Sequence, residues 1–151
     1  YIYDTRSRLD GPWQGFASEQ EQTALAKAFT EAEDWLYSEE AETAGKSAFQ
    51  TRLDALKRIG DAVAQRVAEA EERPRAEARL RSQIQAYQTF AADTADPRYS
   101  HIDESERGKV RKACADAESW LTTSLDRQAK QAKCERPGLT GRMIDDQRDK
   151  L

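Results

Sequence analysis

Residues 18–36 read SEQEQTALAKAFTEAEDWL, and this stretch decides the fold class. Ser18 and Glu21 form a capping box, in which the serine hydroxyl accepts from the Glu21 amide and the glutamate side chain reaches back to the Ser18 amide. The apolar residues that follow recur at steps of four, three and four: Leu25, Phe29, Ala32 and Leu36. This spacing predicts an α-helix that buries one apolar stripe and leaves its other faces in water.

The flanking sequence repeats this pattern. Residues 1–9 place Ile2, Arg6 and Leu9 on one helical face before Gly11, and we interpret them as the end of a longer linker helix. A third stripe has helical spacing and tolerates Gly60 with a local bend; its members are Phe49, Leu53, Leu56, Val63 and Val67. After the acidic run that ends at Arg73, Pro74 predicts a break or kink and the start of a new helix.

Two further stripes complete the pattern. The first lies before the turn-rich residues 93–97 and contains Leu80, Ile84, Tyr87 and Ala91. The second follows a capping-box-like start at Asp103 and contains Val110, Cys114, Ala117, Leu121 and Leu125. No segment alternates apolar and polar residues as a strand does. We therefore predict an all-α fold, an antiparallel bundle of four or five helices over residues 1–133. Residues 134–151 are expected to be a weakly ordered tail, in which Met143 and Ile144 could dock.

The composition excludes several classes of protein. Of the 151 residues, 34% are charged and 38% hydrophobic, yet the net charge is only −4, which disagrees with intrinsic disorder because disordered chains combine low hydrophobicity with high net charge. The acidic balance argues against nucleic-acid binding, and no apolar run approaches the ~18 residues of a membrane helix. Two cysteines, Cys114 and Cys134, are too few for a disulfide scaffold and indicate a reducing compartment. Because the chain opens on Tyr1, we expect a piece of a longer protein.

The sequence predicts no catalytic, cofactor-binding or metal-binding residues. His101 is the only histidine and is expected in a loop, Cys114 on an apolar helix face, and Cys134 as an incidental thiol. Adjacent carboxylates such as those of residues 33–34 and 71–72 point in different directions on a helix and indicate solvated faces. Two Trp-Leu pairs, Trp35-Leu36 and Trp120-Leu121, are expected to be structural and to seal the ends of the bundle.

Five motifs resemble one family. They are residues 1–9 (YIYDTRSRL), 33–37 (EDWLY), 53–60 (LDALKRIG), 71–74 (EERP), and 98–103 (RYSHID) followed by 119–121 (SWL). In this order they are similar to the C-terminal helical, or lid, region of the one-hundred-and-ten-kilodalton heat-shock proteins, the large branch of the seventy-kilodalton heat-shock chaperone superfamily. Pro74 belongs to the motif typical of the large branch. The resemblance ends near residue 128, and Trp13 and Ser100 depart from the family pattern.

The resemblance implies that this chain is part of a chaperone and is not itself an enzyme. The large branch acts as a nucleotide exchange factor for a smaller heat-shock chaperone, whose nucleotide-binding domain its helical bundle lies against, and as a holdase for unfolded client proteins. ATP binding would belong to a domain outside this chain. The exposed face of the first helix, with Asp4 and Arg8, is our candidate partner contact, and a cytoplasmic location is expected. A helical client- or peptide-binding module and a generic structural scaffold bundle remain open alternatives.

Overall fold

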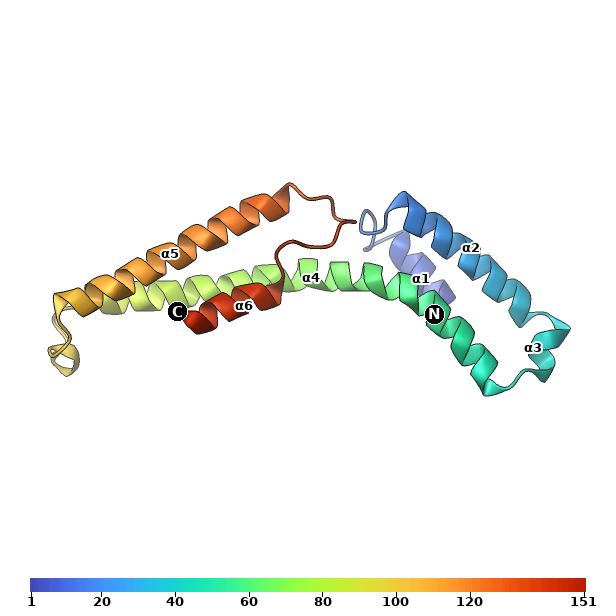
Figure 1. Cartoon of the computed structure of the whole chain (residues 1–151), viewed down its shortest axis with the longest axis horizontal. Helices are drawn as coiled ribbons and strands as arrows, with labels where there is room; N and C mark the ends of the chain where they lie inside the picture. Colours follow the sequence, from blue (N-terminus) through green and yellow to red (C-terminus); the bar gives the residue numbers. More distant parts are fainter. The chain divides into compact units, whose positions relative to one another are not determined.

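The computed structural model describes all 151 residues and is all-α, as predicted. It contains six α-helices and one short 3₁₀ helix (Figure 1): α1 Ile2–Leu9, α2 Glu19–Leu36, α3 Glu39–Thr43, α4 Lys46–Ala92, η1 Pro97–Tyr99, α5 Glu104–Ala129 and α6 Gly141–Lys150. The count differs from four or five because α3 and α6 are additional helices, while α4 joins the two helices that were predicted on either side of Pro74. No helix is apolar over a stretch long enough to cross a membrane.

The chain divides into two compact units where a single bundle over residues 1–133 was expected. The first comprises Tyr1–Ala68 with Ala132–Arg136, and the second comprises Glu69–Gln131 with Pro137–Leu151. Helix α4 contributes its first half to one unit and its second half to the other. The apolar stripes explain the division, because those before and after the acidic run at residues 69–73 face different sets of partner helices.

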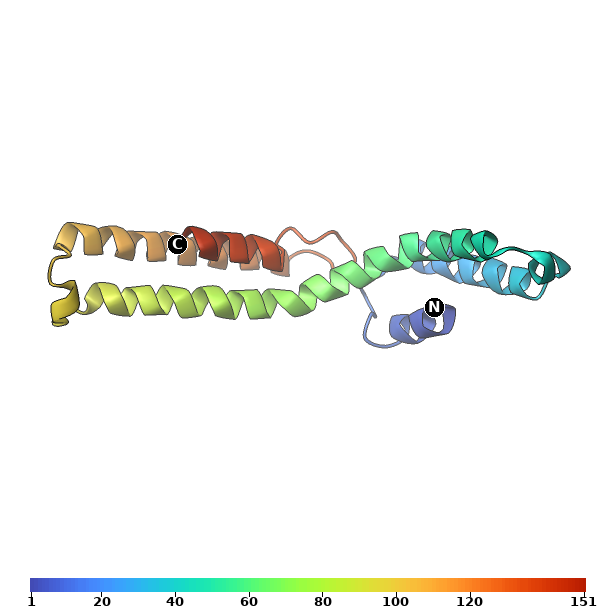
Figure 2. The ribbon, with the colours of Figure 1, turned by 90° about the horizontal axis from the view of Figure 1, so that it is seen from below.

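In the first unit, α2 lies beside the first half of α4 and α1 packs against both (Figure 2). The capping box is present, since the Ser18 hydroxyl accepts from the Glu21 amide at 3.2 Å and the Glu21 carboxylate accepts from the Ser18 amide at 2.9 Å. Two apolar clusters fill the interior, one around Leu25, Phe29, Ala32 and Leu56 and the other around Trp13, Ala17, Val63 and Val67. The predicted stripes of these helices therefore supply most of this core, whereas two of their members, Leu36 and Phe49, are exposed.

The last turn of α2 differs from the predicted stripe. Trp35 is buried, with 7% of its surface exposed, whereas Leu36 is 47% exposed. At 3.6 residues per turn, Leu36 lies close to the line of Leu25, Phe29 and Ala32, and Trp35 lies about 80° to one side of it. Because the indole is larger and has Phe49 as a partner, it takes the inner position and turns Leu36 outward.

Pro74 does not break the chain into two helices, because α4 continues through it. The Pro74 side chain lies on an exposed face of α4. A proline inside a helix costs ~3 kcal/mol, and the buried side chains of Val67 and Leu80 on either side each contribute about 1.5–3 kcal/mol. Arg73 also donates to the Leu139 carbonyl at 3.0 Å and holds this turn from the side. Packing therefore outweighs the local preference for a helix end.

In the second unit, α5 lies alongside the second half of α4, and α6 packs against this pair (Figures 1 and 2). The core contains Ala76, Leu80, Ile84, Cys114, Ala117, Leu121, Leu139 and Ile144. Residues 134–151 were expected to be weakly ordered, but Leu139 is 2% and Ile144 0% exposed. Thr140 caps α6 by accepting from the Met143 amide at 3.2 Å. A capped turn with two buried aliphatic anchors explains why this segment is a helix.

A buried arginine organises the turn between α4 and α5. Arg107 is 3% exposed and has no carboxylate partner. Its guanidinium donates to four backbone carbonyls, those of Phe90 (2.9 Å), Asp93 (2.6 Å), Tyr99 (3.1 Å) and Ile102 (3.4 Å). These carbonyls belong to the end of α4 and the following turn, where no helical amide can reach them. Arg107 thus fixes the irregular segment at residues 93–103.

Candidate functional site

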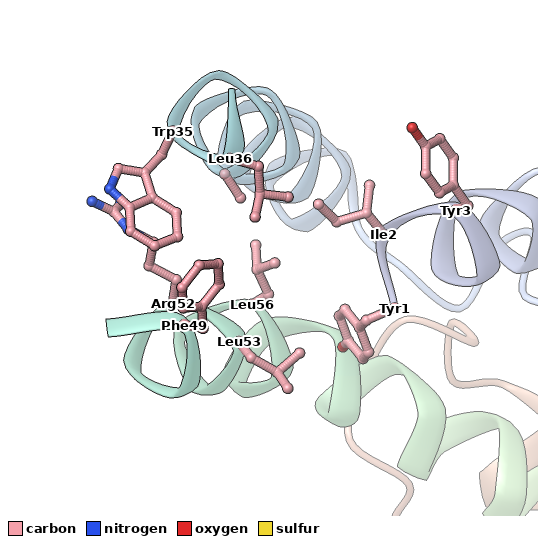
Figure 3. Close-up of a pocket in the computed structure, with 10 residues that line it drawn as sticks. Tyr1, Ile2, Tyr3, Trp35, Leu36, Phe49, Arg52, Leu53 and Leu56 are labelled. Carbon is pink, nitrogen blue, oxygen red and sulfur yellow. The ribbon is translucent and has the colours of Figure 1, made fainter. Parts of the chain in front are cut away.

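A largely apolar groove of about 330 Å³ lies in the first unit between α1, the end of α2 and the start of α4 (Figure 3). Its lining is almost entirely apolar and aromatic: Tyr1, Ile2, Tyr3, Ala32, Trp35, Leu36, Phe49, Arg52, Leu53 and Leu56. The volume is at the small end of the range for ligand pockets, and the lining suits a few apolar side chains. We call this opening the α1–α2–α4 groove.

An aromatic pair closes one end of the groove. Trp35 and Phe49 meet edge to face, with ring centroids 4.9 Å apart and planes at 67°. The Arg52 guanidinium stacks over the indole at 4.1 Å, which adds a cation–π contact. Trp35 Nε1 is buried and has no hydrogen-bond partner. The rigid end wall is therefore set by packing, with one polar group left unsatisfied.

Several large apolar and aromatic side chains at the rim of the groove are exposed. Tyr1 and Phe49 are each 40% exposed, Leu36 is 47% and Tyr3 is 73% exposed. These residues come from three helices and surround one opening, so they form a contiguous patch rather than scattered surface positions. Such patches mark interaction sites in folded proteins. The lining offers apolar and aromatic side chains, which suit contact with an apolar group.

A glycine allows α1 to approach α4 beside this groove. The Tyr1 hydroxyl lies 2.1 Å from the place where a Cβ on Gly60 would stand, and Thr5 lies 3.8 Å from it. Gly60 was predicted to permit a bend, but its function here is to leave room for another helix. Burial raises the pKa of the Tyr1 phenol, and the nearby Asp61 carboxylate raises it further. The sequence pattern does not predict this contact, because a glycine between the apolar residues of a helix looks the same whether or not another helix packs against it.

The predicted partner-contact residues lie on the surface of α1 but are occupied with each other. Arg8 Nε and Asp4 Oδ2 are 3.0 Å apart, and the two side chains are 50% and 62% exposed. The same helix carries a stronger pair that the sequence did not reveal. Arg6 donates two hydrogen bonds of 2.8 Å to Glu33, which raises the pKa of the Arg6 guanidinium. Glu33 is therefore a docking partner for α1, not a fully solvated side chain.

The remaining predicted residues lie away from the groove. Trp120 is half-buried against the core of the second unit, and Leu121 is fully buried in it. Burial raises the pKa of the Cys114 thiol, and His101 is exposed in the turn before α5. Cys134 is partly exposed and makes no disulfide. No group of three or more His, Cys, Asp or Glu side chains has metal-binding geometry.

Comparison with known proteins shows that the chain's homologues are large heat-shock proteins. It is 34% identical over 146 residues to a 97 kDa heat shock protein of Mesocentrotus franciscanus, over 95% of this chain. It is 34% identical over 139 residues to heat shock 70 kDa protein 14 of Arabidopsis thaliana and 31% identical over 134 residues to heat shock 70 kDa protein 4 of Homo sapiens. The chain spans only 16% of the length of each of these relatives. No family model and no solved structure matches it.

Proposed function

We propose that this chain is the C-terminal helical domain of a chaperone of the large heat-shock branch, and that it serves as the arm of a nucleotide exchange factor and holdase. The observation that carries the proposal is similarity to such proteins over nearly the whole chain, at 92–95% coverage for the first two relatives. ATP binding and any ATPase activity would belong to the rest of the parent protein. The proposed partner is the nucleotide-binding domain of a smaller heat-shock chaperone, in the cytoplasm.

The surface of the chain supports a reversible contact with such a partner. Two ion pairs, Asp4–Arg8 on α1 and Lys27–Glu31 on α2, are exposed, and exposed charges favour fast, steered and readily reversed association. The Asp4–Arg8 pair offers the partner both signs of charge on one helix face. Since each such pair contributes little to folding, it can exchange its bonds for bonds to a partner at small cost.

The test is nucleotide release from the smaller chaperone in the presence of the parent protein. Removing residues 1–151 should slow the stimulated release, and so should Asp4→Ala combined with Arg8→Ala. The matched control is Lys27→Ala with Glu31→Ala, an exposed pair with the same spacing on α2. An unchanged rate after deletion of the whole segment would contradict the function as an arm. Equal effects of the two double variants would contradict the contact at Asp4 and Arg8.

A second candidate function, binding of an apolar peptide or unfolded client, is favoured by the exposed α1–α2–α4 groove. Leu53→Glu would place a charge in its lining without removing a buried core residue. In a light-scattering assay, the isolated Leu53→Glu chain should no longer suppress client aggregation. Its buried core, which includes Leu56, should remain folded. If the unaltered chain does not suppress aggregation at all, this second function is wrong, and a purely structural scaffold gains support.

A further inference from the structure

One buried hydrogen-bond donor in the lining of the α1–α2–α4 groove has no acceptor. Trp35 is 7% exposed, and its indole Nε1 is buried without a hydrogen-bond partner. Leaving a buried N–H group unpaired costs free energy, and nearly all such groups in folded proteins therefore have an acceptor. Since this N–H group belongs to a residue that lines an opening, a bound molecule is the acceptor that would satisfy it.

A second group of donors lies beside the first. The Arg52 guanidinium is stacked over the Trp35 ring, 4.1 Å from its centroid, and Figure 3 shows the indole nitrogen and the guanidinium at the same end of the groove. The Glu40 carboxylate, with which Arg52 pairs, is 4.0 Å from Nη2, which is too far for a hydrogen bond. Arg52 carries the only charged side chain in the lining. The groove therefore ends in a cation and an N–H group that both need an acceptor.

A carboxylate fits this pair of donors better than a neutral acceptor does. Its two oxygens accept two parallel hydrogen bonds from a guanidinium and still have lone pairs for the indole N–H. The present partner, Glu40, is held loosely, because the Arg52 and Glu40 side chains are 42% and 74% exposed and such pairs contribute little to stability. A ligand carboxylate can therefore displace Glu40, and the long Arg52 side chain can turn with it away from the indole.

Apolar side chains continue from the donor pair into the groove. Phe49 is 40% exposed and contacts Trp35 edge to face, and Leu53 and Leu56 lie further along α4 in the same lining. The volume of about 330 Å³ suits a few apolar side chains. The donor pair and these apolar residues all come from α2 and α4. Together they match a ligand that combines apolar side chains with one carboxylate.

We propose that the groove binds a peptide segment that carries an acidic side chain next to bulky apolar ones. The carboxylate is bound by the Arg52 guanidinium and the Trp35 indole N–H, and the apolar side chains pack against Phe49 and Leu53. This inference rests on the second candidate function, binding of an apolar peptide, and adds the group that such a peptide must carry. Apolar contact holds the peptide, and the carboxylate gives selectivity among peptides.

The test compares two peptides of nearly equal shape, acetyl-Leu-Phe-Glu-amide and acetyl-Leu-Phe-Gln-amide, on the whole chain. Binding is followed by NMR at the Trp35 indole N–H resonance. We expect the glutamate peptide to bind about 10-fold tighter and to move this resonance downfield, because the indole gains a charged acceptor. Equal affinities would overturn the carboxylate site and leave apolar peptide binding standing. Binding of neither peptide would also overturn it, and the light-scattering assay then decides the second candidate function separately.

Three single variants at exposed or partly exposed positions test which charges matter. Arg52→Gln should remove the preference for the glutamate peptide, and unchanged binding of the glutamine peptide would show that the groove is still folded. Glu40→Gln removes the competing carboxylate and should tighten binding of the glutamate peptide about 3-fold. The matched control is Lys46→Gln, an exposed cation at the start of α4 outside the lining, which should keep the preference. If Lys46→Gln and Arg52→Gln reduce the preference equally, general attraction of charge explains it and the site is refuted.

Discussion

The buried guanidinium of Arg107 gives the sharpest prediction about stability. The substitution Arg107→Met keeps much of the side-chain length and removes all the donors that serve the turn at residues 93–103. Three of the four bonds are 3.1 Å or shorter, and hydrogen bonds to charged groups contribute about 1.5–3 kcal/mol each. Water can reach some carbonyls of an exposed turn, so the sum is an upper bound, and we expect a loss of about 3–5 kcal/mol.

The assay is urea unfolding followed by circular dichroism, with hydrogen exchange at residues 90–103 as a local readout. The matched control is Arg98→Ala in the same turn, whose side chain is 78% exposed and whose loss should leave the midpoint unchanged. Arg107→Lys should recover only part of the stability, because one ammonium group cannot reach carbonyls on both sides of the turn. If Arg107→Met lowers stability by less than ~1 kcal/mol, the turn is held by other contacts and the importance assigned to this arginine is refuted.

Three further predictions use the same structure. Burial would raise the pKa of Glu21, but hydrogen bonds from Arg66 and from the N-cap residue Ser18 outweigh this effect and lower the pKa. The stability that the Glu21–Arg66 pair contributes is therefore present above the ordinary glutamate pKa and lost as the pH falls through the lowered pKa. A Glu21→Gln variant should lose less stability than the unaltered chain when urea unfolding is measured at decreasing pH. Ile144→Ala should lower the free energy of unfolding of the second unit by about 2–5 kcal/mol, measured by thermal unfolding. A decrease below ~0.5 kcal/mol would show that the Ile144 side chain is not in the core. Gly60→Ala should displace the Tyr1 hydroxyl and return its raised pKa toward the ordinary value in an ultraviolet titration, while helicity is kept; an unchanged titration would contradict the close approach.

The parts of the fold that could be predicted from sequence are those fixed by spacing within one helix. The capping box at Ser18 and the stripes through Leu25 and Leu121 required only local geometry, and apart from Leu36 at the end of the first stripe their buried residues are at predicted positions. The continuity of α4 through Pro74 could not be predicted, because it depends on contacts between residues far apart in the sequence, such as Arg73 and the Leu139 carbonyl, 66 positions away. Helix propensities correctly identify the free-energy cost of Pro74 inside a helix. They do not measure the free energy of side-chain packing, which is larger than that cost.

The candidate site was less predictable than the fold for a related reason. Trp35 was recognised as structural, but which of two adjacent residues faces inward was decided by a partner on another helix, Phe49. The groove depends on how α1 packs beside α2 and on the absence of a side chain at Gly60. Neither of these two features produces a sequence motif, because a groove depends on where side chains are absent as well as on the residues that line it.

The two proposed functions of the first unit rely on different forces and can be separated by salt. A contact through Asp4 and Arg8 is electrostatic, and raising the ionic strength from ~0.01 M to ~1 M shortens the Debye length from about 30 Å to about 3 Å. Stimulated nucleotide release should then fall steeply. Burial of apolar side chains in the α1–α2–α4 groove is not weakened by screening, so suppression of client aggregation should persist at high salt. A loss of both activities with the same salt dependence would show that one charged surface carries both, and the groove would then have no part in client binding.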